Sequence, residues 1–165
     1  AIVLRDDRDE RGQYDALVSI EMIEAVGEAY WPTYFAALRE RLKPGGRAAL
    51  QSITIDEAIF PRYRREMDFI RHYVFPGGML PTPSHLRALG SGAGLALTHD
   101  VGFGADYART CRLWRLRFET AWPQIAALGF DARFRRLWRY YLAYCEAGFG
   151  AGSLDVRHVA FRRAP

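Results

Sequence analysis

The stretch YDALVSIEMIEAVGEAYWPTYFAALRERLKPGGRAALQSITI, residues 14–55, decides the fold. Residues 14–20 form a near-continuous apolar run of strand length, which is typical of a strand buried on both faces. Residues 31–42 carry large apolar side chains at helical spacing, and KPGG (43–46) then ends the helix and turns the chain. Residues 47–55 form a second apolar run. This order of strand, helix, tight turn and strand predicts a βαβ unit with two parallel strands.

The middle of the chain predicts short helices and loops. Residues 57–73 are an Arg-rich helical stretch, which we expect Pro61 to break. FPGGMLPTP (75–83) is typical of a rigid loop, and residues 84–95 predict a short helix with Ser84 as its N-cap.

The C-terminal part predicts two strands that flank a pair of helices. Residues 95–104 begin as a strand, and residues 153–163 alternate as another. Between them lie two amphipathic, aromatic-rich helices at about 106–127 and 131–147. The whole pattern predicts the α/β class, with two parallel strands early and two strands late, the late ones separated by a helical hairpin.

The composition is that of one globular domain with a real core, since half of the 165 residues are apolar and 25% are charged. No apolar run reaches the about 18 residues of a membrane-spanning helix. The N-terminus AIVLRDDRDE is neither a signal peptide nor a transit peptide. Cys111, Cys145 and the four histidines follow no metal-ligand spacing. We therefore expect a cytoplasmic protein without a metal site.

Arginines are concentrated in residues 109–139, although the net charge is only +4. They are Arg109, Arg112, Arg115, Arg117, Arg133, Arg135, Arg136 and Arg139. Guanidinium groups suit phosphates and carboxylates. This group is therefore either a solvated helix face or a surface for anionic lipid. Nucleic acid is not expected as a partner, because no nucleic-acid motif accompanies the charge.

Polar side chains lie where the two parallel strands are predicted to end. Glu21 and Glu24 follow residues 14–20, and Gln51 and Ile53 lie near the end of the next strand. Carboxylates at the mouth of a buried strand cost free energy unless a ligand needs them. Open α/β sheets bind ligands outside the carboxyl ends of their strands. The architecture therefore predicts a site at this edge.

Five segments of the sequence are distinctive when they are taken together. They are YDALVSIEMIEAVG, YFAALRERLKPGGRAALQSITI, FIRHYVFPGGMLPTP, VGFGADYARTCRLWRLRFETAWPQI and RRLWRYYLAYCEAGFGAGSLDVRHVAF. In this order they resemble the cyclopropane-fatty-acyl-phospholipid synthase family, which includes the mycolic acid cyclopropane synthases. The resemblance implies an S-adenosylmethionine-dependent enzyme with a class I, Rossmann-like methyltransferase sheet. The helical hairpin, about residues 105–150, would be a cap inserted before the last strand.

The resemblance also implies that residues 1–165 are the C-terminal part of one methyltransferase domain. The family's glycine-rich loop, which holds the methionine part of S-adenosylmethionine, has no counterpart in this sequence. LRDDRDE (4–10) stands where the family has an acidic stretch beside the adenine. Asp6, Asp7 and Arg8 are therefore the expected cofactor-binding residues.

The family's reaction implies a phospholipid with an unsaturated acyl chain as substrate and a bound bicarbonate ion as base. The motifs assign Glu24 in EMIEAVG and Tyr107 in FGADY to this ion, and Ile53 would offer a backbone N–H. The family's histidine in this strand is replaced by Gln51, which can donate a hydrogen bond but cannot carry a proton. Glu21 is the alternative to Glu24, because it lies closer to the strand.

Cys145 in YYLAYC matches the cysteine that is assigned to the family's active site. A buried free cysteine is otherwise a small hydrophobic residue, and no histidine lies near it in the sequence to activate it as a nucleophile. Tyr107 could likewise be a core tyrosine with a satisfied hydroxyl group.

Two classes of function remain open from the sequence. The first is methylene or methyl transfer to unsaturated acyl chains, cyclopropane fatty acid formation above all, by a longer enzyme at the inner face of the membrane. On this hypothesis the 165 residues alone are inactive, and the open edge of strand 14–20 favours a homo-oligomer. The second is a non-catalytic remnant that binds lipid or a partner protein. A methyltransferase of another small molecule is a further alternative.

Overall fold

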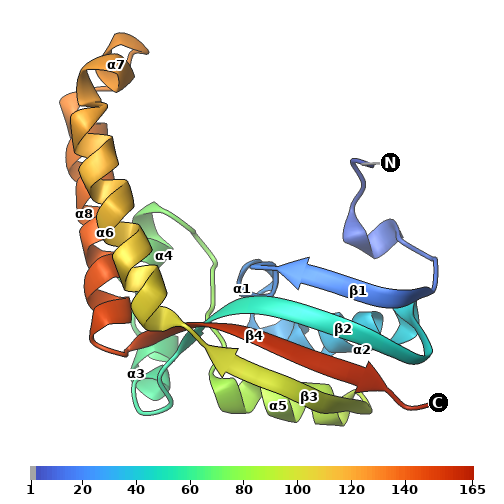
Figure 1. Cartoon of the computed structure of the whole chain (residues 1–165). Coiled ribbons are helices and arrows are strands. Elements are labelled where there is room, and N and C mark those ends of the chain that lie inside the picture. The colour runs from blue at the N-terminus through green and yellow to red at the C-terminus, as the bar shows by residue number, and fades with distance from the viewer. Residues whose placement is uncertain (1–2) are drawn as a thin grey trace.

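A four-stranded sheet forms the centre of the molecule (Figure 1). The computed structural model describes residues 3–165, apart from the side chain of Asp7. The strands are β1 (Tyr14–Ile20), β2 (Leu42–Ile55), β3 (Leu95–Gly102) and β4 (Leu154–Arg163). They lie in the order β1-β2-β4-β3; β1 is parallel to β2, and β4 is antiparallel to both of its neighbours. The α/β class with a parallel pair of early strands is confirmed.

Helices cover one face of this sheet, and further helices lie beyond one of its ends (Figure 1). They are η1 (Asp7–Asp9), α1 (Ile23–Val26), η2 (Glu28–Tyr30), α2 (Trp31–Arg41), α3 (Phe60–Arg65), α4 (Phe69–Tyr73), α5 (Pro83–Gly92), α6 (Gly104–Thr120), α7 (Trp122–Ala127) and α8 (Ala132–Gly150). Both α2 and α5 lie on the same face of the sheet (Figure 1). The core between them contains Phe35, Leu86 and Phe161, which are almost completely buried. A Cβ atom at Gly90 would lie 2.2 Å from a ring carbon of Phe161, so only glycine lets α5 pack this closely.

The helices α6, α7 and α8 form an arm that projects from one end of the sheet (Figure 1). Its base packs on β4 through a second apolar cluster of Cys111, Cys145, Phe149 and Val156. The backbone N–H of Gly104 donates to the carboxylate of Asp155 at 2.7 Å, which fixes the start of α6 to β4. The predicted helical hairpin before the last strand is confirmed.

The expectation that the first strand is buried on both faces is wrong for the described residues. Val18 is 70% exposed and Ile20 is 59% exposed. Within residues 3–165, β1 has β2 as its one neighbouring strand, and no described helix covers the face that carries these side chains. An apolar run shows that a strand needs cover, but it does not show which residues supply it.

Two helix boundaries differ from the predictions because proline and the capping residues act at helix starts. Pro61 lies in the first turn of α3, where its missing N–H costs nothing, and α4 begins instead after Asp68. Thr82, not Ser84, caps α5, since the Thr82 hydroxyl oxygen accepts from the backbone N–H of His85 at 3.2 Å.

The KPGG segment is part of an irregular start of β2 rather than a turn outside the strand. The register against β1 shifts between Tyr14 and Ala16, which pair with Leu42 and Arg47. Gly45 takes a positive φ of 76° within this bulge, a conformation that glycine adopts without strain.

Candidate active site

Two glutamates follow β1 at the edge where the parallel strands end. The backbone N–H of Glu21 donates to the carbonyl of Gln51 at 2.9 Å and so continues the ladder between β1 and β2. Glu24 lies one turn later, in α1. The site that the strand order predicted is therefore assembled from these two residues and from the end of β2.

The carboxylate of Glu24 is held against the backbone of β2. Its Oε1 accepts from the Ile53 N–H at 2.6 Å and from the hydroxyl of the fully buried Ser52 at 2.9 Å. Its Oε2 is buried without a hydrogen-bond partner among the described residues. Burial raises the pKa of Glu24, and the charge of Glu21 acts in the same direction. Glu24 is thus a buried carboxyl group with one oxygen that lacks a hydrogen-bond partner among the described residues.

The carboxylate of Glu21 organises a second group of side chains. Its Oε1 accepts from Gln51 Nε2 at 2.8 Å and from the Tyr107 hydroxyl at 3.0 Å. Tyr107 reaches it from the first turn of α6. Burial, and then the charge of Glu21, raises the pKa of Tyr107 to about 12. Tyr107 is therefore a neutral phenol that donates a hydrogen bond at physiological pH.

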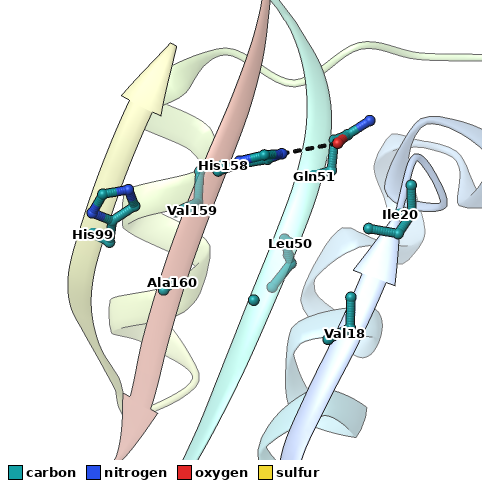
Figure 2. A pocket seen from close by; sticks show the side chains of 9 residues that line it. Val18, Ile20, Leu50, Gln51, His99, His158, Val159 and Ala160 are labelled. Atoms are coloured by element: carbon teal, nitrogen blue, oxygen red, sulfur yellow. Dashed lines mark hydrogen bonds between the residues drawn. The ribbon is translucent and has the colours of Figure 1, made fainter. Parts of the chain in front are cut away.

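His158 completes this second group, although sequence reasoning did not select it. Its Nε2 lies 2.9 Å from Gln51 Oε1, and its ring packs on Phe103 with centroids 4.6 Å apart. Figure 2 shows the two side chains pointing toward each other from β2 and β4, at one end of a hollow of about 320 Å³. Two features of the sequence indicate this contact. His158 lies on an alternating strand, and Gln51 stands where the resembling family has a histidine.

Cys145 lies beneath Tyr107 rather than beside the carboxylates. Both cysteines are free and buried in the cluster at the base of the arm, and Tyr107 packs against that cluster. The hydrogen bond that the Cys145 thiol donates to Cys111, followed by burial, raises the pKa of the Cys145 thiol. The thiol is therefore protonated, and it can line the site but is not activated as a nucleophile.

The expected cofactor residues near the N-terminus pair with each other. The guanidinium of Arg8 donates to both carboxylate oxygens of Asp6, at 2.9 and 2.7 Å. This pairing, first through the Arg8 side chain and then through its backbone N–H, lowers the pKa of Asp6 to about 2. The side chain of Asp7 lies outside the described residues. Within residues 3–165, no hydrogen bond joins Asp6 to the two glutamates.

The sequence-based predictions for the site are thus placed in two neighbouring sets. Glu24 and Ile53 come together directly, while Tyr107 and Gln51 meet at Glu21. In the part of the chain that the structure describes, no group of three or more His, Cys, Asp or Glu side chains could hold a metal ion. No helix among the same residues is long and apolar enough to cross a membrane.

Comparison with known proteins gives consistent relatives. A sequence model described as "Mycolic acid cyclopropane synthetase" matches residues 1–159. The chain is 47% identical over 156 residues to tuberculostearic acid methyltransferase UfaA1 of Mycobacterium tuberculosis, covering 94% of this chain and 36% of that protein. It is 36% identical over 165 residues to the cyclopropane-fatty-acyl-phospholipid synthase of Escherichia coli, covering 98% and 41%. The chain thus spans well under half the length of these two relatives.

Solved structures agree with the sequence relatives. The mycolic acid cyclopropane synthase CmaA1, complexed with SAH and CTAB, superposes with a TM-score of 0.88 at 25% identity, covering 98% of this chain and 59% of that one. A putative sarcosine dimethylglycine methyltransferase from Galdieria sulphuraria shares the fold, with a TM-score of 0.74 at 15% identity, covering 94% of this chain and 55% of that one. The sheet is therefore that of a class I methyltransferase.

Proposed function

The chain belongs to the mycolic acid cyclopropane synthetase family, and we propose that it is part of an enzyme that transfers a methylene or methyl group from S-adenosylmethionine to the double bond of an unsaturated phospholipid acyl chain. The names of two relatives, a tuberculostearic acid methyltransferase and a cyclopropane-fatty-acyl-phospholipid synthase, support this substrate class. One observation carries the proposal, namely that the buried Oε2 of Glu24, at the carboxyl end of two parallel strands, has no hydrogen-bond partner in the part of the chain that the structure describes.

The chemistry needs negative charge at this place. The electron pair of the double bond forms a bond to the methyl carbon, and the pair of the carbon–sulfur bond stays on sulfur. Positive charge therefore passes from the sulfonium to the acyl chain, and loss of a proton then closes a cyclopropane ring or leaves a branched product. Glu21 and Glu24 would place two carboxylates near the acyl chain. A preorganised negative charge there stabilises the developing positive charge and so lowers the activation barrier.

We propose bicarbonate as the base. The Glu24 oxygen without a partner among the described residues fits such an ion, because it can accept the O–H of bicarbonate. The second N–H of Gln51 can donate to another oxygen of the ion, while the one O–H of Tyr107 holds Glu21 beside it. When bound, bicarbonate would supply the base that takes the departing proton. Ile53 acts through Glu24 in this arrangement, since its N–H already donates to that carboxylate. Cys145 would line the site below Tyr107.

The cofactor proposal assigns the adenine side of S-adenosylmethionine to Asp6, Asp7 and Arg8. The Asp6–Arg8 pair is exposed, so a ligand could exchange into its hydrogen bonds. Because these residues would hold only one end of the cofactor, we expect residues 1–165 alone to bind it weakly and to be inactive.

Kinetics of the full natural chain test the proposal. Glu24→Gln and Tyr107→Phe should each lower kcat on the order of a hundredfold, because each removes a preorganised polar group. Binding of S-adenosylmethionine, measured by calorimetry, should be retained. Glu66→Gln is the matched control, since the Glu66 carboxylate is exposed and pairs with Arg62 on the surface of α3. A Glu24→Gln enzyme with normal turnover would remove Glu24 from the proposal.

The arm formed by α6, α7 and α8 is proposed to contact an anionic membrane surface. Three of its eight arginines pair with two carboxylates, since Arg115 pairs with Glu146, and Arg135 and Arg139 share Glu119. The other five are exposed and have no ion pair among the described residues: Arg109, Arg112, Arg117, Arg133 and Arg136. Each contributes about 1 kcal/mol near an anionic surface.

Apolar side chains at the end of the arm support the same contact. Leu128 is 78% exposed and Phe130 is 45% exposed, and both lie in the turn that joins α7 to α8. Exposed arginines beside exposed apolar residues are typical of a surface that lies in the lipid headgroup region. The enzyme would then act as a peripheral protein at the inner face of the membrane.

A further inference from the structure

The side chains of Gln51 and His158 form a cross-strand pair, and His158 has no role in the reaction proposed above. The two residues lie directly opposite each other in the register of β2 and β4. Both side chains lie on the uncovered face of the sheet, and His99 of β3 lines the same hollow (Figure 2). His99 has no hydrogen-bond partner among the described residues, whereas His158 is joined to Gln51.

The direction of each hydrogen bond follows from the carboxylate at the end of the chain. An ionised carboxylate only accepts, so the group of Gln51 that faces Glu21 is the NH₂ group. The amide oxygen of Gln51 therefore faces His158, and the Nε2 of His158 must carry the proton in this contact. The hydrogen bond from the imidazole thus helps to hold the amide in the orientation that Glu21 requires, and the imidazole ring itself packs on the Phe103 ring.

Glu21, at the other end, is held in a strained backbone conformation. Its φ is 50°, and it is the one non-glycine residue with positive φ among the residues that the structure describes. A left-handed conformation costs a residue with a Cβ atom free energy that glycine does not lose. Strain of this kind persists where a side chain is needed for function. The strain at Glu21 therefore favours a functional role for its side chain.

We propose that His158 is a positioning residue which, through Gln51, orients the Glu21 carboxylate toward the reacting acyl chain. This inference rests on the proposed function, in which positive charge develops on that chain. Gln51 and Tyr107 both donate to Oε1 of Glu21. The other oxygen, Oε2, has no partner among the described residues and would face the acyl chain. Glu21 then acts as a second carboxylate beside Glu24, and its own orientation depends on His158.

Steady-state kinetics of the full natural chain on vesicles with monounsaturated phospholipid test this role. His158→Ala should lower kcat by roughly 10- to 100-fold with little change of KM, because a misplaced charged group loses rate rather than substrate affinity. His99→Gln should leave both parameters at wild-type values, which makes it the matched control in the same hollow. The exchange variant Gln51→His/His158→Gln should recover most of the loss, since the paired strands keep the two groups in contact.

Two results would overturn the proposal. One is a His158→Ala enzyme with normal kcat. The other is a loss of kcat that the exchange variant does not restore and that is matched by a fall in Tm, which would show a structural role instead.

Nuclear magnetic resonance separates failure of this inference from failure of the proposed function. Long-range proton–nitrogen spectra should show His158 locked with its proton on Nε2, and Gln51→Ala should release it to the tautomer mixture of His99. If no lipid is methylated but His158 is locked in this way, the proposed function fails and the positioning of Glu21 stands. If His158 already behaves like His99 in the wild type, the inference fails whatever the activity is.

Discussion

Replacement of Glu24 by glutamine should stabilise the protein at neutral pH while it removes activity. The wild-type carboxylate keeps one buried oxygen without a partner, and such an unsatisfied polar group costs about 1–3 kcal/mol, or more when it is charged. Glutamine keeps an oxygen that can accept from Ile53 and Ser52. Its NH₂ group takes the place of Oε2 and gains no partner, so the expected gain comes from removal of the buried charge alone. We expect the free energy of unfolding at neutral pH to rise by about 1 kcal/mol, which corresponds to roughly 2–4 °C in Tm for a chain of this size.

The pH dependence of this gain follows from the raised pKa of Glu24. In the unfolded chain the carboxyl titrates near its ordinary pKa of 4.5, whereas burial raises the pKa of Glu24 in the folded state. As the pH rises through the window between these two values, the folded state holds a proton that the unfolded state has lost. The contribution of Glu24 to stability therefore falls across that window, and Glu24→Gln, which has no titrating group at this position, avoids that loss.

Thermal unfolding followed by circular dichroism, from about pH 4 to about pH 8, measures both effects. The advantage of Glu24→Gln should be small at the acid end and should grow toward neutral pH, while Glu66→Gln shows no such trend. If the variant is less stable than wild type at neutral pH, or if the difference is independent of pH, then burial of the Glu24 charge is not the cost that we infer from the structure.

Three further predictions concern strain, membrane contact and the open strand. Glu21→Gly should unfold at a Tm a few degrees higher than that of Glu21→Ala, because alanine has a Cβ atom at a φ of 50° and glycine does not. Equal Tm values for the two variants would exclude backbone strain at this position. Arg112→Glu/Arg136→Glu should weaken sedimentation with anionic vesicles, an effect that added salt reduces; equal binding of wild type to neutral vesicles would contradict the membrane proposal. Residues 1–165 alone should self-associate through the exposed edge of β1 in analytical ultracentrifugation, and Val18→Lys should reduce this, whereas a monodisperse wild-type monomer would disprove it.

Much of the fold could be predicted because hydrophobic periodicity reports local structure. The strand at 14–20, the helical hairpin and the last strand were all placed from it, and the structure confirms each of them. The predictions that failed depend on tertiary context instead. The sequence of β1 does not show which other residues cover its apolar side chains. The choice between Thr82 and Ser84 as N-cap depends on which hydroxyl group accepts from the N–H of His85.

The site was predictable as a set of residues but not as a set of contacts. Strand ends and motif resemblance brought Glu24, Ile53, Gln51 and Tyr107 to one edge, yet the tyrosine hydroxyl meets Glu21 rather than Glu24. Which of two carboxylates a phenol reaches depends on the backbone turn after β1, and no periodicity reports a positive φ. A cross-strand partner such as His158 is likewise visible only once the register of β2 and β4 is known.

Mass spectrometry of the lipid product tests the central claim most directly. The full natural chain is incubated with methyl-labelled S-adenosylmethionine and a phospholipid that carries one monounsaturated acyl chain, with Glu24→Gln in parallel. The account predicts that the wild type adds one labelled carbon at the former double bond, as a cyclopropane ring or a branch, and that the variant adds almost none. A label on the headgroup, no label in the lipid, or equal labelling by the Glu24→Gln variant would contradict the account.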